Sequence, residues 1–573
     1  MAVREQWYEK RISGDYRTLA EEYSLSPVTA RLLANRGIRG IDAVRDFLDE
    51  SHDAADEYAD LPDIEKAVSI LEGKISGQKK IRVIGDYDID GVCASFILSS
   101  GIRKAGGIVD VRIPHRVNDG YGINDRLVLE AKDDGIDTII TCDNGIAAAD
   151  QVDLAHRSGM VMIITDHHEI PFHMDGNKVV YDIPDADAVV DIKLPDSRYG
   201  YRDICGAVVA YKLVLALFDR MKVDRAEAAE YIEEAAFATV GDVMPLTGEN
   251  RKLVRAGLKK MSCTKNPGLK ALIREQSLEG KDISVYHVGF VLGPCINATG
   301  RLGSAENALR LFEEKDEKKA AEYAHTLSVM NMERKDMTEK AVKTALEMAA
   351  LPDYENDRVL VLFLPDVHES VAGIVAGKVR EQTGKPSFVL TRSGELIKGS
   401  GRSIDEYDMY AGMNAVSHLF VKFGGHRMAG GLSLEEDKVG SFRKEINSIC
   451  TLTDEDIVKK IRFDMVLPFA YADTDLCRQI ESLGPFGTGN PTPLFAAAKV
   501  SVSDMKIMGK NKNCLKAKIT DAEGTKKEAV FLGEAKEFQD YCRAHEKIDI
   551  LFGLQINTYR DKEKVEIKIS HYR

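Results

Sequence analysis

Three aspartates stand at alternate positions in the stretch "VIGDYDIDG", residues 83–91. Asp86, Asp88 and Asp90 follow an apolar run and are followed by a glycine. So many carboxylates repel one another unless cations neutralise them, and this spacing favours a metal-binding loop over a solvated acidic turn. An EF-hand loop is disfavoured, because position twelve counted from Asp86 is Ile97 instead of a glutamate and because a strand precedes the motif.

Two further polar clusters follow apolar runs. Asp143 and Asn144 follow "IDTIITC", and Asp166, His167 and His168 follow "MVMIIT". Oxygen and imidazole ligands suit Mn²⁺, Mg²⁺ or Zn²⁺, and the absence of thiolates in these clusters argues against a structural zinc site. Five or six acids with a histidine are enough for two divalent ions, which can hold a phosphate and activate water. Hydrolysis of a phosphate ester or anhydride is therefore the expected chemistry.

The elements that must position these groups alternate between strands and helices. Short apolar runs predict strands at residues 81–85, 107–114, 136–142 and 160–165. The segments between them predict helices at residues 92–106, 124–135 and 147–159. Such alternation indicates right-handed βαβ units and a parallel sheet covered by helices. Because sites form beyond the carboxyl ends of parallel strands, we expect the three polar clusters to meet at one edge.

The whole chain is predicted to contain five segments. Residues 1–60 are polar with helical spacing, residues 61–304 contain the parallel sheet, and residues 305–350 form a connecting helix. Residues 351–455 repeat an α/β pattern on a smaller scale. Residues 456–573 show many short strands separated by turn signals, which predict a small β-barrel.

Composition limits the class of protein. The chain has 573 residues, 44% hydrophobic and 30% charged, as in ordinary globular proteins with several domains. Its net charge of 78 − 92 = −14 excludes a wholly basic DNA-coating surface but allows a local basic groove. Nine cysteines without a C-x-x-C pair favour free thiols in a reducing compartment. With neither a signal-like N-terminus nor a long apolar run, we expect a cytoplasmic protein that contacts no membrane.

Several motifs carry a family resemblance. The stretches "DYDIDG", "CDNG" and "TDHHE" resemble the DHH phosphoesterase family. Residues 238–251, 293–309, 398–403, 423–432 and 483–495 extend this likeness, over nearly the whole chain, to its RecJ family of single-strand-specific 5′→3′ DNA exonucleases. The resemblance implies an α/β fold with a parallel-sheet DHH domain and a smaller α/β DHH-associated (DHHA1) domain, joined by a long helix. It also implies a C-terminal OB-fold β-barrel.

The same resemblance assigns roles to individual residues. Two divalent cations, Mn²⁺ or Mg²⁺, are expected on the ligands Asp88, Asp90, Asp143, His167 and Asp242. Three neighbouring residues are expected to act in catalysis. Asp86, the first acid of its motif, would support the ligands, and Asp166 and His168 would orient His167 or touch the scissile phosphate. Residues expected to bind the substrate are Arg116, Arg301, Ser400, Arg402, His426, Gly424 and Gly425. Of these, Arg116, Ser400 and Arg402 are expected to hold its 5′ end.

The expected OB segment contains a lysine-rich stretch. Its lysines are Lys506, Lys510, Lys512, Lys516 and Lys518, and Tyr559 and Arg560 lie further along the chain. OB-folds bind single strands with basic grooves and stacking aromatic side chains. A charge run is also common on an ordinary solvated face, so DNA contact and a bland surface stay open as alternatives.

The function implied by the resemblance is a single-stranded-DNA-specific 5′→3′ exonuclease that releases 5′-mononucleotides in DNA repair and recombination. A monomer is implied, with single-stranded DNA, single-strand-binding protein and a RecQ-type helicase as partners. One alternative is a short-oligonucleotide phosphodiesterase of the DHH family, and another is a catalytically inactive DNA-binding scaffold. An inorganic pyrophosphatase is disfavoured, because Ile84 stands where that branch has a histidine.

Overall fold

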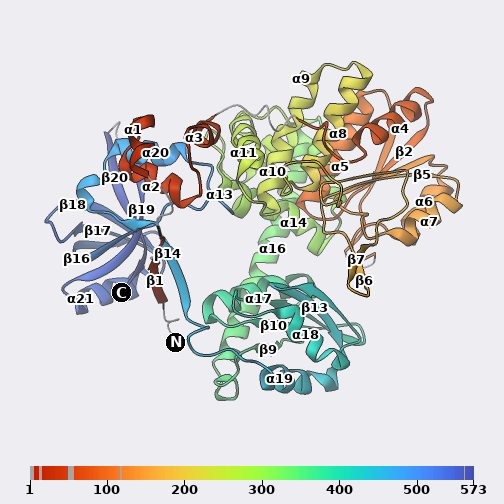
Figure 1. The fold of residues 1–573 in the computed structure, drawn as a ribbon. Coiled ribbons are helices and arrows are strands. Elements are labelled where there is room, and N and C mark those ends of the chain that lie inside the picture. The colour runs from red at the N-terminus through yellow and green to blue at the C-terminus, as the bar shows by residue number, and fades with distance from the viewer. Residues whose placement is uncertain (1–4, 12–15, 50–56, 117–118, 560–561) are drawn as a thin grey trace. The chain divides into compact units, whose positions relative to one another are not determined.

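The computed structural model describes residues 5–11, 16–49, 57–116, 119–559 and 562–573 (Figure 1). The chain divides into two compact units, which we describe separately. The large unit comprises Trp7–Gly293, Leu309–Ala320 and Arg462–Arg573, and the small unit consists mainly of Pro294–Ala308 and Ala321–Ile461. The predicted β-barrel and the predicted parallel sheet therefore belong to the same compact unit.

A parallel five-stranded sheet lies at the centre of the large unit. Its order is β3-β2-β4-β5-β8, and all four pairings are parallel, as predicted. The strands are β2 (Lys80–Ile84), β3 (Ile108–Arg112), β4 (Thr138–Cys142), β5 (Val161–Asp166) and β8 (Ala188–Asp191). From β2 the chain passes first to β3 on one side and then to β4 on the other. The topological switch point, where open α/β sheets bind ligands, therefore lies between β2 and β4.

Helices cover both faces of this sheet. One face packs on α6 (Asp125–Asp133) and α7 (Ala149–Arg157), through strand residues that include Ile84, Ile139 and Ile164. The alternate strand residues are also buried, and α4 (Ile64–Ser76), α5 (Ile89–Lys104) and α8 (Gly206–Met221) pack on the sheet there. Burial on both faces explains why these strands are continuous apolar runs.

A helical segment follows the sheet. It contains α9 (Arg225–Ala228), α10 (Ile232–Gly241), α11 (Gly248–Met261), α12 (Pro267–Glu275), α13 (Val285–His287), a π-helix η3 (Val288–Leu292) and α14 (Gly293–Leu302). The predicted connecting helix is a pair, α15 (Glu306–Glu313) and α16 (Glu317–Ala349). The break has a local cause, because the Asp316 carboxylate accepts the backbone N–H groups of Lys318 and Lys319 and so caps α16.

The small unit contains a second α/β layer, as predicted. Its sheet has the order β12-β13-β11-β10-β9, with β9 and β10 parallel and the other pairs antiparallel. The strands are β9 (Leu360–Phe363), β10 (Ser387–Ser393), β11 (Leu396–Arg402), β12 (Lys422–His426) and β13 (Ala429–Leu434). One face carries a core shared with α18 (Met409–Ala415) and α19 (Val439–Ser448), and α17 (Glu369–Thr383) packs over β10 and β11.

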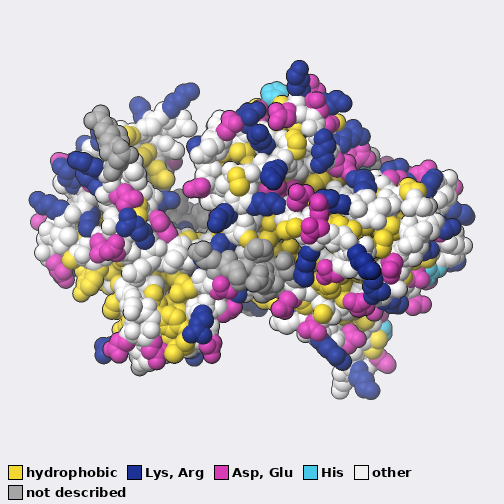
Figure 2. Space-filling view, turned by 90° about the horizontal axis from the view of Figure 1, so that it is seen from above, with side chains coloured by type: hydrophobic (Ala, Val, Ile, Leu, Met, Phe, Trp, Pro, Cys, Tyr) yellow, Lys and Arg dark blue, Asp and Glu magenta, His cyan; other side chains and the backbone are white. Residues whose placement is uncertain are grey.

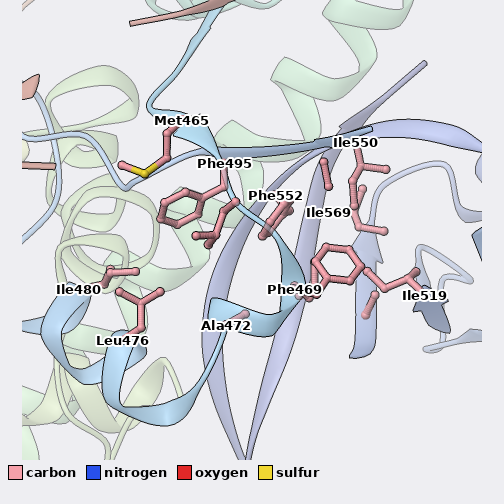
Figure 3. Packing of buried hydrophobic residues seen from close by; sticks show 14 of the residues in the cluster. Met465, Phe469, Ala472, Leu476, Ile480, Phe495, Ile519, Ile550, Phe552 and Ile569 are labelled. Carbon is pink, nitrogen blue, oxygen red and sulfur yellow. The ribbon is translucent and has the colours of Figure 1, made fainter. Parts of the chain in front are cut away.

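The C-terminal segment forms the predicted β-barrel. Strands β16 (Phe495–Met508), β17 (Cys514–Thr520), β18 (Lys526–Leu532), β20 (Lys562–Tyr572) and β19 (Ile548–Tyr559) pair in that order, and β19 returns to β16. Helix α21 (Ala535–Ala544) connects β18 to β19. Phe469, Phe495, Phe552, Ile519 and Ile550 gather inside the barrel (Figure 3). Alternation of such residues with polar ones is typical of a barrel that is filled by side chains.

The N-terminal segment differs in one place from the helical expectation. Helices α1 (Tyr16–Tyr23), α2 (Pro27–Asn35) and α3 (Ile41–Leu48) are present, but Glu5–Glu9 forms a strand, β1, which pairs with β14 (Lys459–Phe463). The pairing partner lies far away in sequence, so a local pattern could not reveal it. The helices contribute Leu19, Leu33 and Phe47 to the barrel's core cluster.

Within the described residues, no helix combines the length and the apolarity needed to cross a bilayer. The face shown in Figure 2 mixes acidic with basic side chains, as expected for an acidic protein without a basic coat. All nine cysteines of the sequence are free in the described structure, in agreement with the expected free thiols.

Candidate active site

The acidic loop after β2 lies at the switch point of the parallel sheet. Asp88 is the N-cap of α5, and its Oδ1 accepts the backbone N–H groups of Asp90 (2.9 Å) and Gly91 (3.1 Å). A Cβ on Gly91 would lie 2.5 Å from the backbone nitrogen of Asp86, so only glycine lets the loop fold this tightly. The "DYDIDG" motif therefore consists of a strand end, a helix cap and a first helical turn.

Asp90 is held by a second helix N-terminus. Its Oδ2 accepts the backbone N–H of Gly206 (2.7 Å) and its Oδ1 that of Ala207 (2.8 Å), at the start of α8. A Cβ on Gly206 would lie 2.7 Å from the Cβ of Asp143, so this helix start also packs directly on the second acidic strand end. The positive ends of two helix dipoles, α5 and α8, thus face the same acids.

Asp143 follows β4 and meets the histidine from the next strand. It is buried, and its φ of +60° lies in the left-handed region. Its Oδ1 lies 3.1 Å from Nε2 of His167, and Oδ2 of Asp90 lies 3.5 Å from the same nitrogen. A non-glycine residue in the left-handed region costs energy, although aspartate tolerates this region better than most residues do.

Asn144 fixes the loop that passes over the site. Its Oδ1 accepts the N–H of Ile123 (3.1 Å), and its Nδ2 donates to the carbonyls of Ile84 (3.2 Å) and Cys142 (2.9 Å). The neighbouring N–H of Gly122 donates to Oδ1 of Asp86 (3.3 Å). One buried amide therefore joins the ends of β2 and β4 to the loop before α6.

Asp166 orients His168. Its Oδ1 accepts from Nδ1 of His168 (2.7 Å), and its Oδ2 accepts the N–H of Ile146 (3.0 Å). The hydroxyl of Tyr121 lies 3.0 Å from the backbone oxygen of Asp143, to which it donates, and 3.0 Å from Nε2 of His168. We expected Asp166 to support the ring of His167, but the structure pairs it with the ring of the adjacent histidine.

Ligand atoms of the site fall into small groups that fit metal ions. One group is Asp90, His167 and Asp242, whose ligand atoms all lie within 4.8 Å of one another. A second group, with the same spacing, is Asp86, Asp88 and Asp143. A third joins Asp143 to both histidines. Two separate trios, in contact through the 3.1 Å approach of His167 to Asp143, match the expectation of two divalent ions.

The acids fit such ions electrostatically. Burial, reinforced by Asp88, raises the pKa of Asp86 to about 8, and burial together with Asp90 raises the pKa of Asp242 to about 8. The same two causes, burial and Asp90, raise the pKa of Asp143 and of Asp88. Oδ2 of Asp86 is buried with no hydrogen-bond partner among the described residues. Cations would supply the missing partner and remove the repulsion between these carboxylates.

The two histidines differ in charge state. Burial lowers the pKa of His167, which favours the neutral imidazole that binds metals. Burial alone would also lower the pKa of His168, but its hydrogen bond to Asp166 and the nearby acids outweigh this effect and raise the pKa to about 9. At neutral pH these surroundings favour the charged form of His168 and the neutral form of His167.

The predicted residues of the large unit meet as expected at one edge of the sheet. The structure brings together Asp86, Asp88, Asp90, Asp143, Asp166, His167, His168 and Asp242. Asp242 arrives from the end of α10, far from the strands in sequence. Arg116 lies beside them, with its guanidinium carbon 5.1 Å from the ring centre of Tyr87, which stands between two of the acids.

The predicted substrate residues of the small unit share one sheet face. Ser400 pairs with Gly431, which pairs with Gly424, and Arg402 pairs with Ala429, which pairs with His426. Directly paired residues of antiparallel strands point to the same face. Ser400, Arg402 and His426 therefore point to one side, and two glycines leave the space between them open. This three-strand surface, called here the glycine face, suits close approach of a phosphate.

Local packing supports the glycine face. A Cβ on Gly373 of α17 would lie 3.0 Å from Nη2 of Arg402, so this glycine makes room for the guanidinium. Gly425 has φ +145°, and a Cβ there would lie 2.4 Å from the oxygen of Ala429. Arg301 of α14 is placed differently, because it donates to the backbone oxygen of Ser370 at the start of α17. Its described contact is therefore structural.

The lysine-rich stretch occupies β16, β17 and the turn between them, on the barrel. Lys516 lies 3.3 Å from Glu566, and Lys518 lies 2.7 Å from Asp504. Lys506, Lys510 and Lys512 are exposed. Arg560 and the side chain of Tyr559 lie outside the described residues. The stretch thus divides into two lysines with acidic neighbours and three exposed ones.

Tyr121 and Asp191 were not foreseen as residues of the site, and Asn144 was placed in a polar cluster without a role. Tyr121 and Asn144 act through the contacts given above. Asp191 ends β8 beside Asp166, and burial, followed by the charge of Asp166, raises its pKa to about 7. The run "AVVD" was the available signal for Asp191, because it repeats the pattern of an apolar strand that ends in an aspartate. The two others belong to loops whose contacts depend on tertiary structure.

Comparison with protein families identifies three regions. Residues 80–240 match the DHH family N-terminal domain, residues 356–452 match the DHHA1 domain, and residues 463–571 match the RecJ OB domain. These regions coincide with the parallel sheet, the sheet of the small unit and the barrel. The expected α/β fold with an OB barrel is thereby confirmed.

Relatives extend over nearly the whole chain. The single-stranded-DNA-specific exonuclease RecJ of Bacillus subtilis is 31% identical over 99% of this chain and 71% of its own length. The RecJ protein of Escherichia coli is 31% identical over 82% of this chain and 83% of its own. The crystal structure of RecJ from Thermus thermophilus in complex with Mn²⁺ matches with a TM-score of 0.82 and 26% identity, covering 100% of this chain and 80% of that one. The chain belongs to the RecJ family.

Proposed function

We propose that this protein is a single-stranded-DNA-specific 5′→3′ exonuclease that hydrolyses phosphodiester bonds and releases 5′-mononucleotides. The observation that carries the proposal is the pair of ligand trios, Asp90–His167–Asp242 and Asp86–Asp88–Asp143, at the switch point of the sheet. Similar proteins are named single-stranded-DNA-specific exonucleases, and solved relatives bind Mn²⁺ or Mg²⁺. DNA repair and recombination are the processes in which such an activity is needed.

The large unit supplies the chemistry. Divalent cations, Mn²⁺ or Mg²⁺, would be held by the two trios, and when bound they lower the pKa of water and neutralise charge on a phosphate. His167 binds in its neutral form, in contact with Asp143 and Asp90. His168, which is protonated and oriented by Asp166, donates a hydrogen bond or proton to a phosphate or leaving oxygen.

Cationic and polar side chains, described here within each unit separately, are proposed to recognise the 5′ end. Arg116 lies beside Tyr87 in the acidic loop, and Ser400 and Arg402 lie on the glycine face. An arginine fork suits a terminal phosphate, which carries more charge than an internal one. Gly424, Gly425 and His426 extend this surface along the edge strand β12. Arg301 would support it by holding the start of α17.

The barrel is proposed to bind the single strand beyond the scissile bond. Basic OB-fold surfaces follow the backbone of single strands. Lys506 on β16, and Lys510 and Lys512 in the turn that follows, are exposed cations of this surface. A phosphodiesterase for very short oligonucleotides has no use for such an extended surface, which disfavours that alternative. The inactive-scaffold alternative is disfavoured because all five predicted ligands are present and meet at one edge.

Cellular context completes the proposal. Single-stranded DNA is the substrate, and single-strand-binding protein and a RecQ-type helicase are proposed as partners that expose and deliver it. The protein is proposed to act as a monomer in the cytoplasm, where reduced cysteines such as the nine found here are stable.

The test is digestion of a 30-nucleotide single strand, labelled at either end, in the presence of Mn²⁺. With the 5′-labelled strand, labelled mononucleotide should appear at once. The 3′-labelled strand should become shorter gradually. A duplex of the same sequence should resist. Release from the 3′ end first, or cleavage restricted to dimers and trimers, would refute the proposed activity.

A further inference from the structure

An exposed aromatic pair stands on the large unit, apart from the residues discussed so far. Tyr286 and Phe290 have 64% and 68% of their surface exposed. Their ring centres lie 5.3 Å apart with an angle of 25° between the planes, so the rings are stacked. Single exposed aromatic side chains are common, but a stacked and exposed pair is more unusual, and each ring of such a pair offers its outer face to a further planar group.

The local backbone creates the stack. Tyr286 belongs to α13, and Phe290 to the π-helix η3 that follows. A π-turn has more residues per turn than an α-helix, which brings side chains four positions apart more nearly above one another. The start of the helix is fixed by a capping box, in which Ser284 and His287 bond each other's backbone N–H groups. Short π-segments are frequently found at functional sites.

The same helical segment packs on the metal-binding elements. A Cβ on Gly293 would lie 3.1 Å from Cδ1 of Ile89, the residue between Asp88 and Asp90. A Cβ on Gly289 would lie 3.8 Å from Cγ1 of Val240, two residues before Asp242. The helix that displays the two rings is therefore packed directly on the segments that carry the ligands.

We propose that Tyr286 and Phe290 form a stacking platform for a nucleobase of the single-stranded substrate, close to the phosphate that is hydrolysed. This inference rests on the proposed function. Every nucleobase has a flat face, so stacking binds unpaired bases without reading their sequence. A base in a duplex has both faces covered by its neighbours, so it must leave the duplex before it can stack on the protein. A stacking platform therefore favours single-stranded DNA.

The size and setting of the platform favour a base over a protein. A stable protein interface buries about 800 Å² on each partner, far more than two rings can offer. His287, beside the pair, is held in the capping box. The platform matches a single planar ligand, and its place on a helix packed against the ligand-bearing segments matches a base of the strand that is being cut.

The platform is tested with the full-length protein and a 5′-phosphorylated, phosphorothioate-linked 20-nucleotide strand that resists hydrolysis. Binding is followed by fluorescence anisotropy. The double variant Tyr286→Ala/Phe290→Ala should bind about 5- to 100-fold more weakly, the range that corresponds to loss of one stacked base. Tyr286→Phe, which keeps the ring, should bind like wild type. Tyr471→Ala serves as the matched control, since Tyr471 is 62% exposed on a different element.

A second series separates stacking from folding. Single abasic nucleotides are placed at successive positions from the 5′ end, and one position should weaken binding of wild type but not of the double variant. Tyr286→Leu, which keeps apolar bulk without a ring, should bind the strand as weakly as Tyr286→Ala does. Unchanged affinity of the double variant, or an abasic penalty that it retains, would overturn the platform. If wild type still releases 5′-mononucleotides in that case, the proposed function stands, whereas wild type without that activity would end the proposed function itself.

Discussion

Nε2 of His167 lies 3.1 Å from Oδ1 of Asp143, and the two residues come from neighbouring strand ends of the parallel sheet. This contact joins the two ligand trios, because His167 belongs to one and Asp143 to the other. Cations bound by the two trios would therefore lie close together, as two-metal hydrolysis of a phosphodiester requires. The contact depends on the left-handed backbone of Asp143 and on Gly206, which leaves space beside it.

Replacement of Asp143 tests whether the contact between the two ligand trios is needed for catalysis. Asp143→Ala should reduce hydrolysis by about a thousandfold or more, because a bound cation supplies several kcal/mol and each 1.4 kcal/mol is a factor of ten. Affinity for a single strand should change little, since the proposed DNA contacts lie elsewhere. Nucleotide release and anisotropy measure the two effects, and Asp153→Ala on the exposed side of α7 is the control. Undiminished hydrolysis by the purified variant would refute the assignment.

Stability without metal should depend on pH in a definite direction. The pKa of Asp86 and of Asp242 is about 8 in the folded protein, against about 4 in an unfolded chain. Between these values the folded state binds more protons than the unfolded state, so stability falls as pH rises from about 4 to about 8. In a chelator, the melting temperature should therefore be lower at pH 8 than at pH 5.5.

Metal binding should reverse this trend. Mn²⁺ at a hundred times its Kd adds about 2.7 kcal/mol for one site, and the gain should be larger at pH 8, where fewer protons compete. Asp86→Asn removes one buried charge, so it should raise the melting temperature in chelator at pH 8 and reduce the gain from Mn²⁺. Thermal denaturation with and without Mn²⁺ measures both effects. A melting temperature in chelator that does not change with pH would contradict this electrostatic picture.

The glycine face predicts a specific defect in recognition of the 5′ end. Arg402→Ala should reduce the preference for 5′-phosphorylated over 5′-hydroxyl strands about tenfold or more, since an arginine fork on a phosphate is a strong charge-assisted contact. The measurement is the ratio of kcat/KM for the two substrates. Arg392→Ala is the control. Arg392 lies on the neighbouring strand β10 and pairs with Glu436, so its replacement should leave this ratio of kcat/KM values unchanged. If Arg402→Ala does not change this ratio, the glycine face does not recognise the 5′ phosphate.

The lysines of the barrel divide into two groups with different expected effects. Replacing the exposed Lys506, Lys510 and Lys512 by alanine should weaken binding and lower the slope of log K against log salt by about 2, at about 0.7 for each phosphate contact. Lys516 and Lys518 have acidic neighbours, so their double replacement should have a smaller effect. Binding measured at several salt concentrations decides between a DNA contact and an ordinary solvated face. Equal slopes for all variants would favour the latter.

Much of the site could be predicted from sequence, because strand ends are local features. The apolar runs before Asp86, Asp143 and Asp166 identify parallel strands, and the sheet's geometry then brings their ends together. Asp242 is different, since it follows a helix and could be assigned only through family resemblance. Its neighbours in space, Asp90 and His167, do not reveal it by spacing.

Other features depend on contacts that a local pattern does not contain. Strand β1 forms because Glu5–Glu9 meets β14 from the opposite end of the chain. Two adjacent histidines look alike in sequence, so the pairing of Asp166 with His168, instead of with the ring of His167, could be seen only in the structure. The π-turn that carries Phe290 beside Tyr286 also has no simple signal in the sequence.

The central claim is that two cations occupy the two ligand trios, and anomalous diffraction from crystals grown with Mn²⁺ tests it most directly. We predict two peaks, one among Asp90, His167 and Asp242 and the other among Asp86, Asp88 and Asp143. Crystals of Asp143→Ala should lose density at the second position. Absence of any manganese peak among these side chains, in crystals of active wild-type protein, would contradict the account.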